Sequence, residues 1–205
     1  MNRVLPILFN TEMVRAILEG RKGATRRSVK GYIPDDAVWG YTAFAPKGYI
    51  SCRGTFADGY GEKFFKLPCE PGNILYVRET WKKAPNGYYY YEDWQKNDIA
   101  DITKWKPSIR MPKEAARIWL KVTDVKVERL QNITEDGSKA EGAIDNRGFI
   151  HSPDNEYDRI HTAREHFIEI WNSTIKKSDF ERCSWDANPW VWVIEFERCE
   201  KPEVN

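Results

Sequence analysis

The sequence predicts an α+β fold, in which helices pack outside a curved sheet of mixed or antiparallel strands. Segments with the alternating pattern of strands outnumber segments with helical periodicity, and the two kinds do not alternate along the chain as they do in parallel α/β folds. Residues 190–196 are apolar on both faces in the first half of the segment, which is typical of a central strand. The chain has 205 residues and a hydrophobic fraction of 41%, which is enough for one core. We expect one domain over residues 1–200, with an insertion at about 31–69 and a tail at 201–205.

The first two expected elements are a short strand and a helix. Residues 4–9 are mostly apolar, and Pro6 suits an edge strand because it has no N–H to donate. Asn10 or Thr11 can cap the helix that follows by accepting a backbone hydrogen bond. The apolar positions of this helix share one face: Met13, Val14, Ile17 and Leu18. Gly20 suits the left-handed position at which a helix ends.

Two long segments lack a regular pattern. Residues 31–69 spread aromatic side chains among glycines, prolines and charges, and residues 49–56 within them indicate a hairpin. We interpret 31–69 as an elaboration that packs on the main sheet. Pro107 and Pro112 exclude an ordinary helix from residues 98–116, so this stretch is expected to be a fixed loop.

Three further strands are expected in the middle of the chain. A Pro-Gly dipeptide at 71–72 predicts a type II turn, and residues 74–81 alternate as a strand after it. The tyrosine run at 88–91 predicts another strand. Residues 117–130 alternate over a long stretch, but the parity of the apolar positions shifts near residues 123–124. Such a shift predicts a β-bulge or a tight bend.

Two helices are expected in the second half of the chain. Thr134 can cap a short helix, which reaches Glu141 and stops at Gly142. Residues 145–160 then read as a polar loop. Residues 162–172 show the clearest helical periodicity, with one apolar face.

Composition limits the possible function classes. The formal net charge is +1, which argues against a strongly basic nucleic-acid binder but leaves room for a local basic patch. The aromatic fraction of 14% includes nine tryptophans, and such rings either fill a core or stack on bases and sugars. The chain lacks an apolar run of about 18 residues that would span a membrane, and its first residues do not resemble a signal peptide. We therefore expect a cytoplasmic protein with no membrane partner.

The four cysteines and three histidines show no metal-ligand spacing. In a reducing compartment, disulfides are not expected either. We interpret the cysteines as ordinary reduced thiols and expect neither a metal nor a cofactor.

The residues with the strongest chemical character form one basic segment at 20–27. Five of its eight side chains donate hydrogen bonds, and four of those carry positive charge: Arg21, Lys22, Thr25, Arg26 and Arg27. Because the segment follows a helix end, we expect it to present fixed cations and a hydroxyl at the edge of a loop. Such a loop is suited to holding an anion or a polar heterocycle.

A second group of candidates lies beside the strand 74–81 and in the loop 98–116: Arg78, Glu79, Trp81, Trp105, Ser108 and Arg110. The charged pair at 78–79 either forms a structural ion pair or holds polar groups of a ligand in the floor of a cleft. The two tryptophans either belong to the core or stack on a base, which is worth about 1–3 kcal/mol per base where it occurs.

The order of these motifs resembles the ASCH superfamily, named for homology to activating signal cointegrator-1. Three motifs carry this resemblance: Gly-Arg-Lys-x-x-Thr-x-Arg after a helix, a Pro-Gly-Asn turn, and a strand that ends in Val-Arg-Glu-Thr-Trp. The later segments Lys-Pro-Ser-Ile-Arg-Met-Pro and Trp-Asp-Ala-Asn-Pro-Trp-Val-Trp resemble a bacteriophage and prophage branch, often labelled hypothetical or "morphogenetic". The resemblance is anchored at residues 4–27, 71–81, 104–142 and 185–197.

The resemblance implies a PUA-like curved β-barrel with flanking helices and a cleft that binds RNA or nucleotides. Some small ASCH proteins are amidohydrolases that deacylate N(4)-acetylcytidine, and others are described as ribonucleases. The lysine, threonine and glutamate of the amidohydrolases correspond to Lys22, Thr25 and Glu141, and Arg27 matches a further basic position. The chain departs from the pattern in its greater length and its long insertion.

The residues allow two interpretations of this set. As catalytic residues, Thr25 would be the nucleophile, Lys22 its base and Glu141 the acid/base partner. As structural residues, Lys22 and Arg26 would be solvated, Thr25 would start a strand and Glu141 would lie exposed on a short helix. Three functions follow: a module that binds RNA, a nucleotide or a modified nucleoside; an amidohydrolase; or a phage accessory protein with a protein partner, or a ribonuclease.

Overall fold

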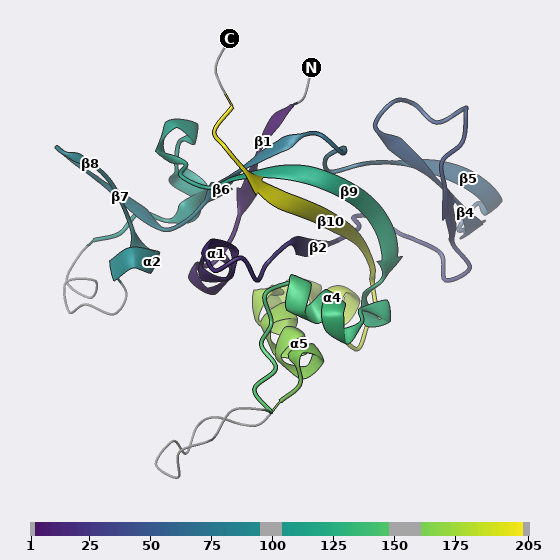
Figure 1. Ribbon diagram of the computed structural model, residues 1–205. Helices are drawn as coiled ribbons and strands as arrows, with labels where there is room; N and C mark the ends of the chain where they lie inside the picture. The colour runs from purple at the N-terminus through teal and green to yellow at the C-terminus, as the bar shows by residue number, and fades with distance from the viewer. Residues whose placement is uncertain (1–2, 95–103, 148–160, 203–205) are drawn as a thin grey trace.

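The computed structural model describes residues 3–94, 104–147 and 161–202, and its main feature is a curved sheet of five strands (Figure 1). The strands lie in the spatial order β1 (Val4–Leu8), β6 (Ile74–Arg78), β9 (Trp119–Arg129), β10 (Trp190–Cys199) and β2 (Ala24–Ser28). β1 runs parallel to β6, whereas the other neighbours are antiparallel. The predicted α+β class with a mixed, curved sheet is confirmed. A closed barrel is not found among the described residues, because β1 and β2 are both edge strands.

The long strands β9 and β10 give the sheet its curvature. Glu195 pairs with Asp124 and the next residue, Phe196, pairs with Val122, so Thr123 is an extra residue on β9. The bulge predicted from the shift in apolar parity is therefore confirmed. β10 lies between β9 and β2, which confirms the central position predicted from its apolar faces.

Helix α1 (Thr11–Leu18) connects β1 to β2. The side chain of Asn10 caps it by accepting a hydrogen bond from the Met13 N–H at 2.8 Å, and Gly20 ends it with φ +75°. The strand β2 begins only four residues later, at Ala24. The basic segment was predicted to be a loop, but its second half is a strand, because Thr25 pairs with Ile194 of β10.

Two further helices lie side by side under the arch formed by β9 and β10 (Figure 1). They are α4 (Glu135–Ala140), capped by Thr134, and α5 (Ala163–Thr174), which begins with a complete capping box. They pack on β10 through a second hydrophobic core, which includes Phe167, Trp171 and Val193. Shorter elements complete this part: α6 (Phe180–Cys183) and the 3-10 turns Leu130–Asn132 and Lys177–Asp179.

The strand predicted at 74–81 is interrupted. β6 ends at Arg78, and a separate two-stranded sheet follows, made of β7 (Trp81–Ala84) and β8 (Gly87–Tyr90), with the short helix α2 (Tyr91–Trp94). Residues 104–116 contain the 3-10 turns Ser108–Arg110 and Lys113–Ala115 and no α-helix, as the two prolines predicted. The remainder of that loop lies outside the described residues.

The insertion forms a small sheet of its own. β3 (Val38–Gly40), β4 (Tyr49–Phe56) and β5 (Gly59–Lys66) are antiparallel. Residues 49–56, which indicated a hairpin, form only its first strand, β4. The second strand of the hairpin is β5. Trp39 attaches the insertion to the main sheet by edge-on contacts with Trp190 at 5.8 Å and Trp192 at 6.0 Å between ring centroids.

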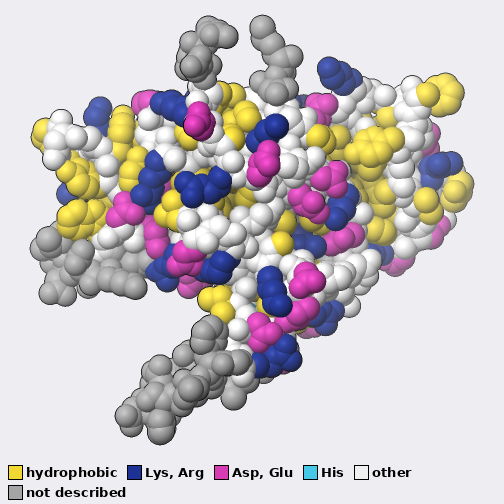
Figure 2. Space-filling view, viewed as in Figure 1, with side chains coloured by type: hydrophobic (Ala, Val, Ile, Leu, Met, Phe, Trp, Pro, Cys, Tyr) yellow, Lys and Arg dark blue, Asp and Glu magenta, His cyan; other side chains and the backbone are white. Residues whose placement is uncertain are grey.

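Hydrophobic side chains gather on the exposed side of this small sheet (Figure 2). Tyr60 is 75% exposed and Val38 is 60% exposed. Among the described residues, no helix is long and apolar enough to cross a membrane.

Candidate functional site

The free edge of β2 places neighbouring arginines on opposite faces of the sheet. Side chains alternate along a strand, so Arg26 points toward the helices and Arg27 toward the concave side of the sheet. The guanidinium of Arg26 lies 6.0 Å from the ring of Phe167 on α5, and that of Arg27 lies 5.5 Å from the ring of Phe9. Both arginines nevertheless line the same cavity of about 670 Å³, because no described strand pairs with the outer edge of β2.

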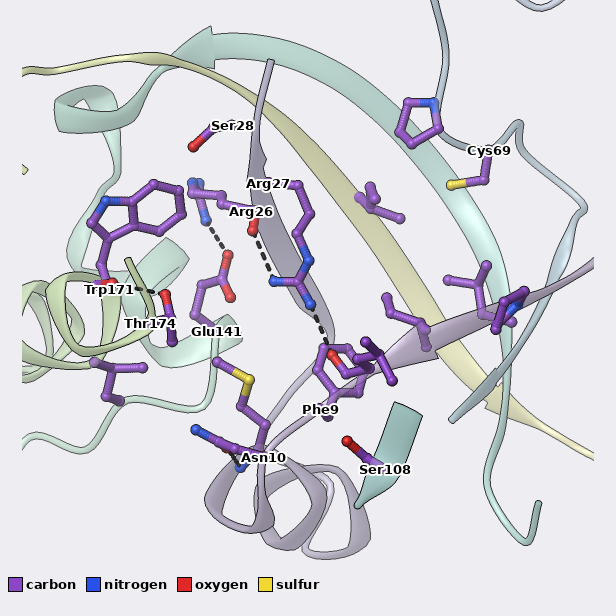
Figure 3. A pocket seen from close by; sticks show the side chains of 18 of the residues that line it. Phe9, Asn10, Arg26, Arg27, Ser28, Cys69, Ser108, Glu141, Trp171 and Thr174 are labelled. Atoms are coloured by element: carbon purple, nitrogen blue, oxygen red, sulfur yellow. Dashed lines mark hydrogen bonds and ion pairs between the residues drawn. The ribbon is translucent and has the colours of Figure 1, made fainter. Parts of the chain in front are cut away.

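This cavity, called here the edge cavity, opens between the two edge strands of the sheet and the helix α5 (Figure 3). Its polar lining includes Asn10, Ser28, Ser108 and Thr174, and its aromatic lining includes Phe9 and Trp171. Toward the sheet the lining is aliphatic, with Leu5, Ile7, Leu75 and Ile194. A volume of this size holds a small organic ligand, and a mostly apolar wall with a few polar groups is typical of ligand sites.

Glu141 is the carboxylate of the edge cavity. It is the C-cap of α4, it is 7% exposed, and it accepts from Lys22 Nζ at 2.8 Å and from Arg26 at 3.3 Å. Its position depends on Gly142, which has φ +95°. A Cβ atom at Gly142 would lie 2.8 Å from the Cβ of Ala16, so only glycine lets the end of α4 approach α1 this closely.

Lys22 is almost fully buried beneath this carboxylate. Its ammonium donates to three oxygens, at 2.8 Å to the Ala24 carbonyl, 2.7 Å to the Glu141 carbonyl and 2.8 Å to the Glu141 carboxylate. Burial lowers the pKa of Lys22, and the charge of Glu141 opposes that shift. Neither residue is solvated or exposed, so the structural interpretation considered from the sequence does not hold for them.

Thr25 lies on the same face of β2 as Arg27 and is fully buried. Its Oγ1 has no hydrogen-bond partner, which is uncommon for a buried hydroxyl. All three protons of the Lys22 ammonium are directed at other oxygens, and Thr25 is not among the residues that line the edge cavity. The structure therefore brings together Lys22, Arg26 and Glu141, with Thr25 adjacent in the chain but behind the cavity wall.

Arg27 crosses the opening between the two edge strands. It donates to the carbonyl oxygen of Arg26 at 3.0 Å and to that of Leu8, on β1, at 3.1 Å (Figure 3). Burial lowers the pKa of its guanidinium, and the negative charge of Glu141 partly opposes this effect.

The other sequence candidates lie elsewhere, except for Ser108. Arg21 pairs with Glu19 at 2.5 Å and donates to the Gly142 carbonyl, away from the edge cavity. Glu79 does not pair with Arg78; it binds Arg117 through two hydrogen bonds of 2.9 Å.

The remaining four candidates are outside the cavity lining formed by the described residues. Arg78 donates to the Ile109 carbonyl at 3.3 Å. Trp81 is a core residue with 4% exposure. Trp105 packs edge-on against Tyr91 at 5.5 Å between centroids, and Arg110 is exposed.

Sequence reasoning missed several residues that shape the edge cavity. Phe9 was expected at the end of a strand and Trp171 within a helix, and Glu128, which holds Arg26 at 2.7 Å from outside the cavity lining, was not singled out. The apolar face of α5 was recognisable from its periodicity, but periodicity does not distinguish a side chain that fills a core from one that borders a cavity. Asn10 was recognised as a helix cap, and its place at the cavity was not.

None of the protein-family models, curated proteins and solved structures compared with the chain matches it. The function is therefore argued from the geometry of the edge cavity.

Proposed function

We propose that the edge cavity binds a ligand that contains a nucleobase, either as a nucleoside, a nucleotide or part of an RNA strand. The observation that carries the proposal is the paired Glu141 carboxylate and Arg26 guanidinium, which line the cavity together. A carboxylate oxygen beside an N–H donor offers one acceptor and one donor to the edge of a base. In this proposal the chain is an ASCH-type protein with a PUA-like, incompletely closed barrel.

The surroundings of the pair support recognition of a flat heterocycle. Trp171 and Phe9 border the cavity on two sides, and at 6% and 3% exposure they supply narrow apolar borders and not open stacking faces. Glu141 retains one free lone pair on each oxygen after its bonds to Lys22 and Arg26. Because both cations hold it in place, the carboxylate is preorganised for a ligand and loses little entropy on binding.

The test is a titration of the four ribonucleosides and N(4)-acetylcytidine by calorimetry, with the wild type beside Glu141→Gln and Glu128→Gln. Glu128 also holds Arg26 but does not line the edge cavity, so it is a matched control. We expect micromolar to millimolar binding of at least one nucleoside, weakened at least ten-fold by Glu141→Gln and less than three-fold by Glu128→Gln. Absence of binding to all five compounds, or equal effects of the two variants, would contradict the proposal.

We propose amide hydrolysis as the second candidate function, supported by the unpartnered hydroxyl of Thr25 and the lowered pKa of Lys22. In this reaction Lys22 first loses a proton to solvent. Thr25 Oγ1 then bonds to the acyl carbon while its proton passes to Lys22, the amide C–N bond breaks, and that proton passes from Lys22 through the Glu141 carboxylate to the leaving amine. Water hydrolyses the threonine ester. The hydroxyl must rotate or shift to reach the cavity, because it lies behind the wall.

Hydrolysis is tested by the ultraviolet change on loss of N(4)-acetylcytidine. We expect turnover by the wild type and by Thr25→Ser, and none by Thr25→Ala. The rate should rise with pH toward the lowered pKa of Lys22, because only the neutral amine accepts a proton. If Thr25→Ala retains the wild-type rate, the catalytic assignment fails, while the binding proposal stands on its own titration.

A further inference from the structure

Arg27 differs from Lys22 and Arg26, the two cations bound to Glu141, in having no carboxylate partner among the described residues. Lys22 pairs with Glu141, and Arg26 pairs with both Glu128 and Glu141. The guanidinium of Arg27 donates only to two neutral backbone carbonyls, and among the described residues no carboxylate lies within 4.0 Å of it.

The local charge balance is consequently positive. Three cations, Lys22, Arg26 and Arg27, face two carboxylates, Glu128 and Glu141. Arg27 is half-buried, and a charge that is partly withdrawn from water without a counter-charge is commonly compensated by a partner or a bound ion. An anionic group in the cavity would supply the missing charge.

Arg27 is also positioned to make directional contacts with such a group. A guanidinium has five N–H donors, and the carbonyls of Arg26 and Leu8 account for two bonds, so three donors remain. The two carbonyls lie on different strands and hold the guanidinium across the cavity (Figure 3). A fixed fork of donors fits the oxygens of a phosphate ester, and its entropy is already lost before the ligand binds.

The N-terminus of α1 adds to the positive potential in the same cavity. Its cap, Asn10, and its first-turn residue Met13 both line the edge cavity, next to the hydroxyl of Ser108. Apart from the Met13 N–H, which donates to the Asn10 side chain, the first turn of α1 has backbone N–H groups without helical partners and a partial positive charge that favours anions, and Glu12 in the same turn offsets part of it. This is independent of the arginine, because it arises from the backbone.

We propose that Arg27 binds a phosphate ester, so that the edge cavity takes its nucleobase ligand in phosphorylated form. The inference rests on the proposed nucleobase binding and specifies its chemistry. The base lies against Arg26 and Glu141 on the helix side of β2, and the phosphate lies against Arg27 on the concave side. The free edge of β2 lets one ligand contact both arginines.

The experiment measures the affinity of each ribonucleoside and of its 5′-monophosphate by calorimetry, on the wild type, Arg27→Gln and Arg27→Lys. Arg21→Gln is the matched control, since Arg21 lies in the same segment but outside the edge cavity. We expect the wild type and Arg21→Gln to bind a monophosphate at least ten-fold more tightly than the nucleoside. In Arg27→Gln this ratio should fall to about one, and Arg27→Lys should retain part of the preference for the monophosphate.

A ratio near one in the wild type, or a ratio that survives in Arg27→Gln, would overturn the inference while leaving the proposed function intact. If no nucleoside or nucleotide binds, the proposed function fails, and inorganic phosphate then tests Arg27 separately. Phosphate binding that is lost in Arg27→Gln supports the anion site, and absent or unchanged binding overturns it. Circular dichroism verifies that each variant is folded, because Arg27 links β1 and β2.

A short oligonucleotide distinguishes two sources of the phosphate. A trinucleotide that binds more tightly than the monophosphate indicates an internal phosphodiester of an RNA strand. The reverse order indicates a free nucleotide. In both cases the affinity added by the phosphate should be lost in Arg27→Gln and should decrease as the salt concentration is raised.

Discussion

Two buried carboxylates of this protein, Glu79 and Glu141, have different surroundings although each is held by arginine. Glu79 is 2% exposed and receives two bonds from Arg117, whose guanidinium stacks on Tyr90 at 4.1 Å. Glu141 is 7% exposed, is shared between two cations and lines a cavity of about 670 Å³. Burial and ion pairing alone therefore do not mark a site; the open space beside the carboxylate does.

The clusters around Glu79 and Glu141 also differ in their charge balance. Arg117 pairs with Glu79 and with Asp93, so two acids surround one cation. Around Glu141 the cations are in excess. The first cluster is complete as it stands and ties α2 to the start of β9 through Asp93 and Arg117, whereas the second is, in our proposal, completed by an anion.

The largest expected difference is in stability. Arg117→Gln leaves Glu79 buried without its cation, and removal of one partner of a buried pair costs about 3–5 kcal/mol. The lower end applies, because the Arg117 side chain is 24% exposed. Arg26→Gln should cost less, since Lys22 still pairs with Glu141. Urea denaturation measures both, and calorimetry should show weaker nucleoside binding for Arg26→Gln only.

A glycine tests whether the position of Glu141 matters as much as its charge. Gly142→Ala forces a non-glycine residue to φ +95° and into contact with Ala16, at a cost of about 1–3 kcal/mol. We expect a lower melting temperature together with weaker nucleoside binding. Gly20→Ala is the control: it also has positive φ, but a Cβ there meets no atom within 4 Å, so only stability should change. Unchanged affinity in Gly142→Ala would separate Glu141 from ligand recognition.

A smaller difference between the Glu79 and Glu141 clusters is expected in how the free energy of unfolding depends on pH. Burial raises the pKa of Glu79 in the folded protein, so the folded state binds more protons than the unfolded state above the ordinary value of 4.5. The stabilising contribution of protonated Glu79 is present below pH 4.5 and is lost as pH rises through the raised pKa. Urea denaturation at several pH values should show this slope in the wild type and its loss in Glu79→Gln. A slope that persists would assign it to another group.

The smallest expected effect comes from replacing the helix caps. Asn10 caps α1 beside the edge cavity, and Thr162 caps α5 outside it. Replacing either residue by alanine should lower the free energy of unfolding by about 1 kcal/mol. Only Asn10→Ala should also weaken binding of a nucleotide. Equal affinities in the two variants would place the anion away from the N-terminus of α1.

Local sequence patterns determined most of the secondary structure. The cap at Asn10, the turn at residues 71–72, the bulge at Thr123 and the central position of β10 all follow from residue types and their spacing. These features depend on neighbours in the chain, so a single sequence contains enough information to predict them. The same holds for the recognition of Lys22 as chemically notable.

Tertiary structure decided the rest, because it depends on which distant segments meet. The pairing of Thr25 with Ile194 turned an expected loop into an edge strand and thereby sent Arg26 and Arg27 to opposite faces. Glu79 binds Arg117, 38 positions along the chain, instead of its neighbour Arg78. The edge cavity exists because β1 and β2, among the described residues, each keep one edge without a neighbouring strand, and no local pattern encodes the space between two strand edges.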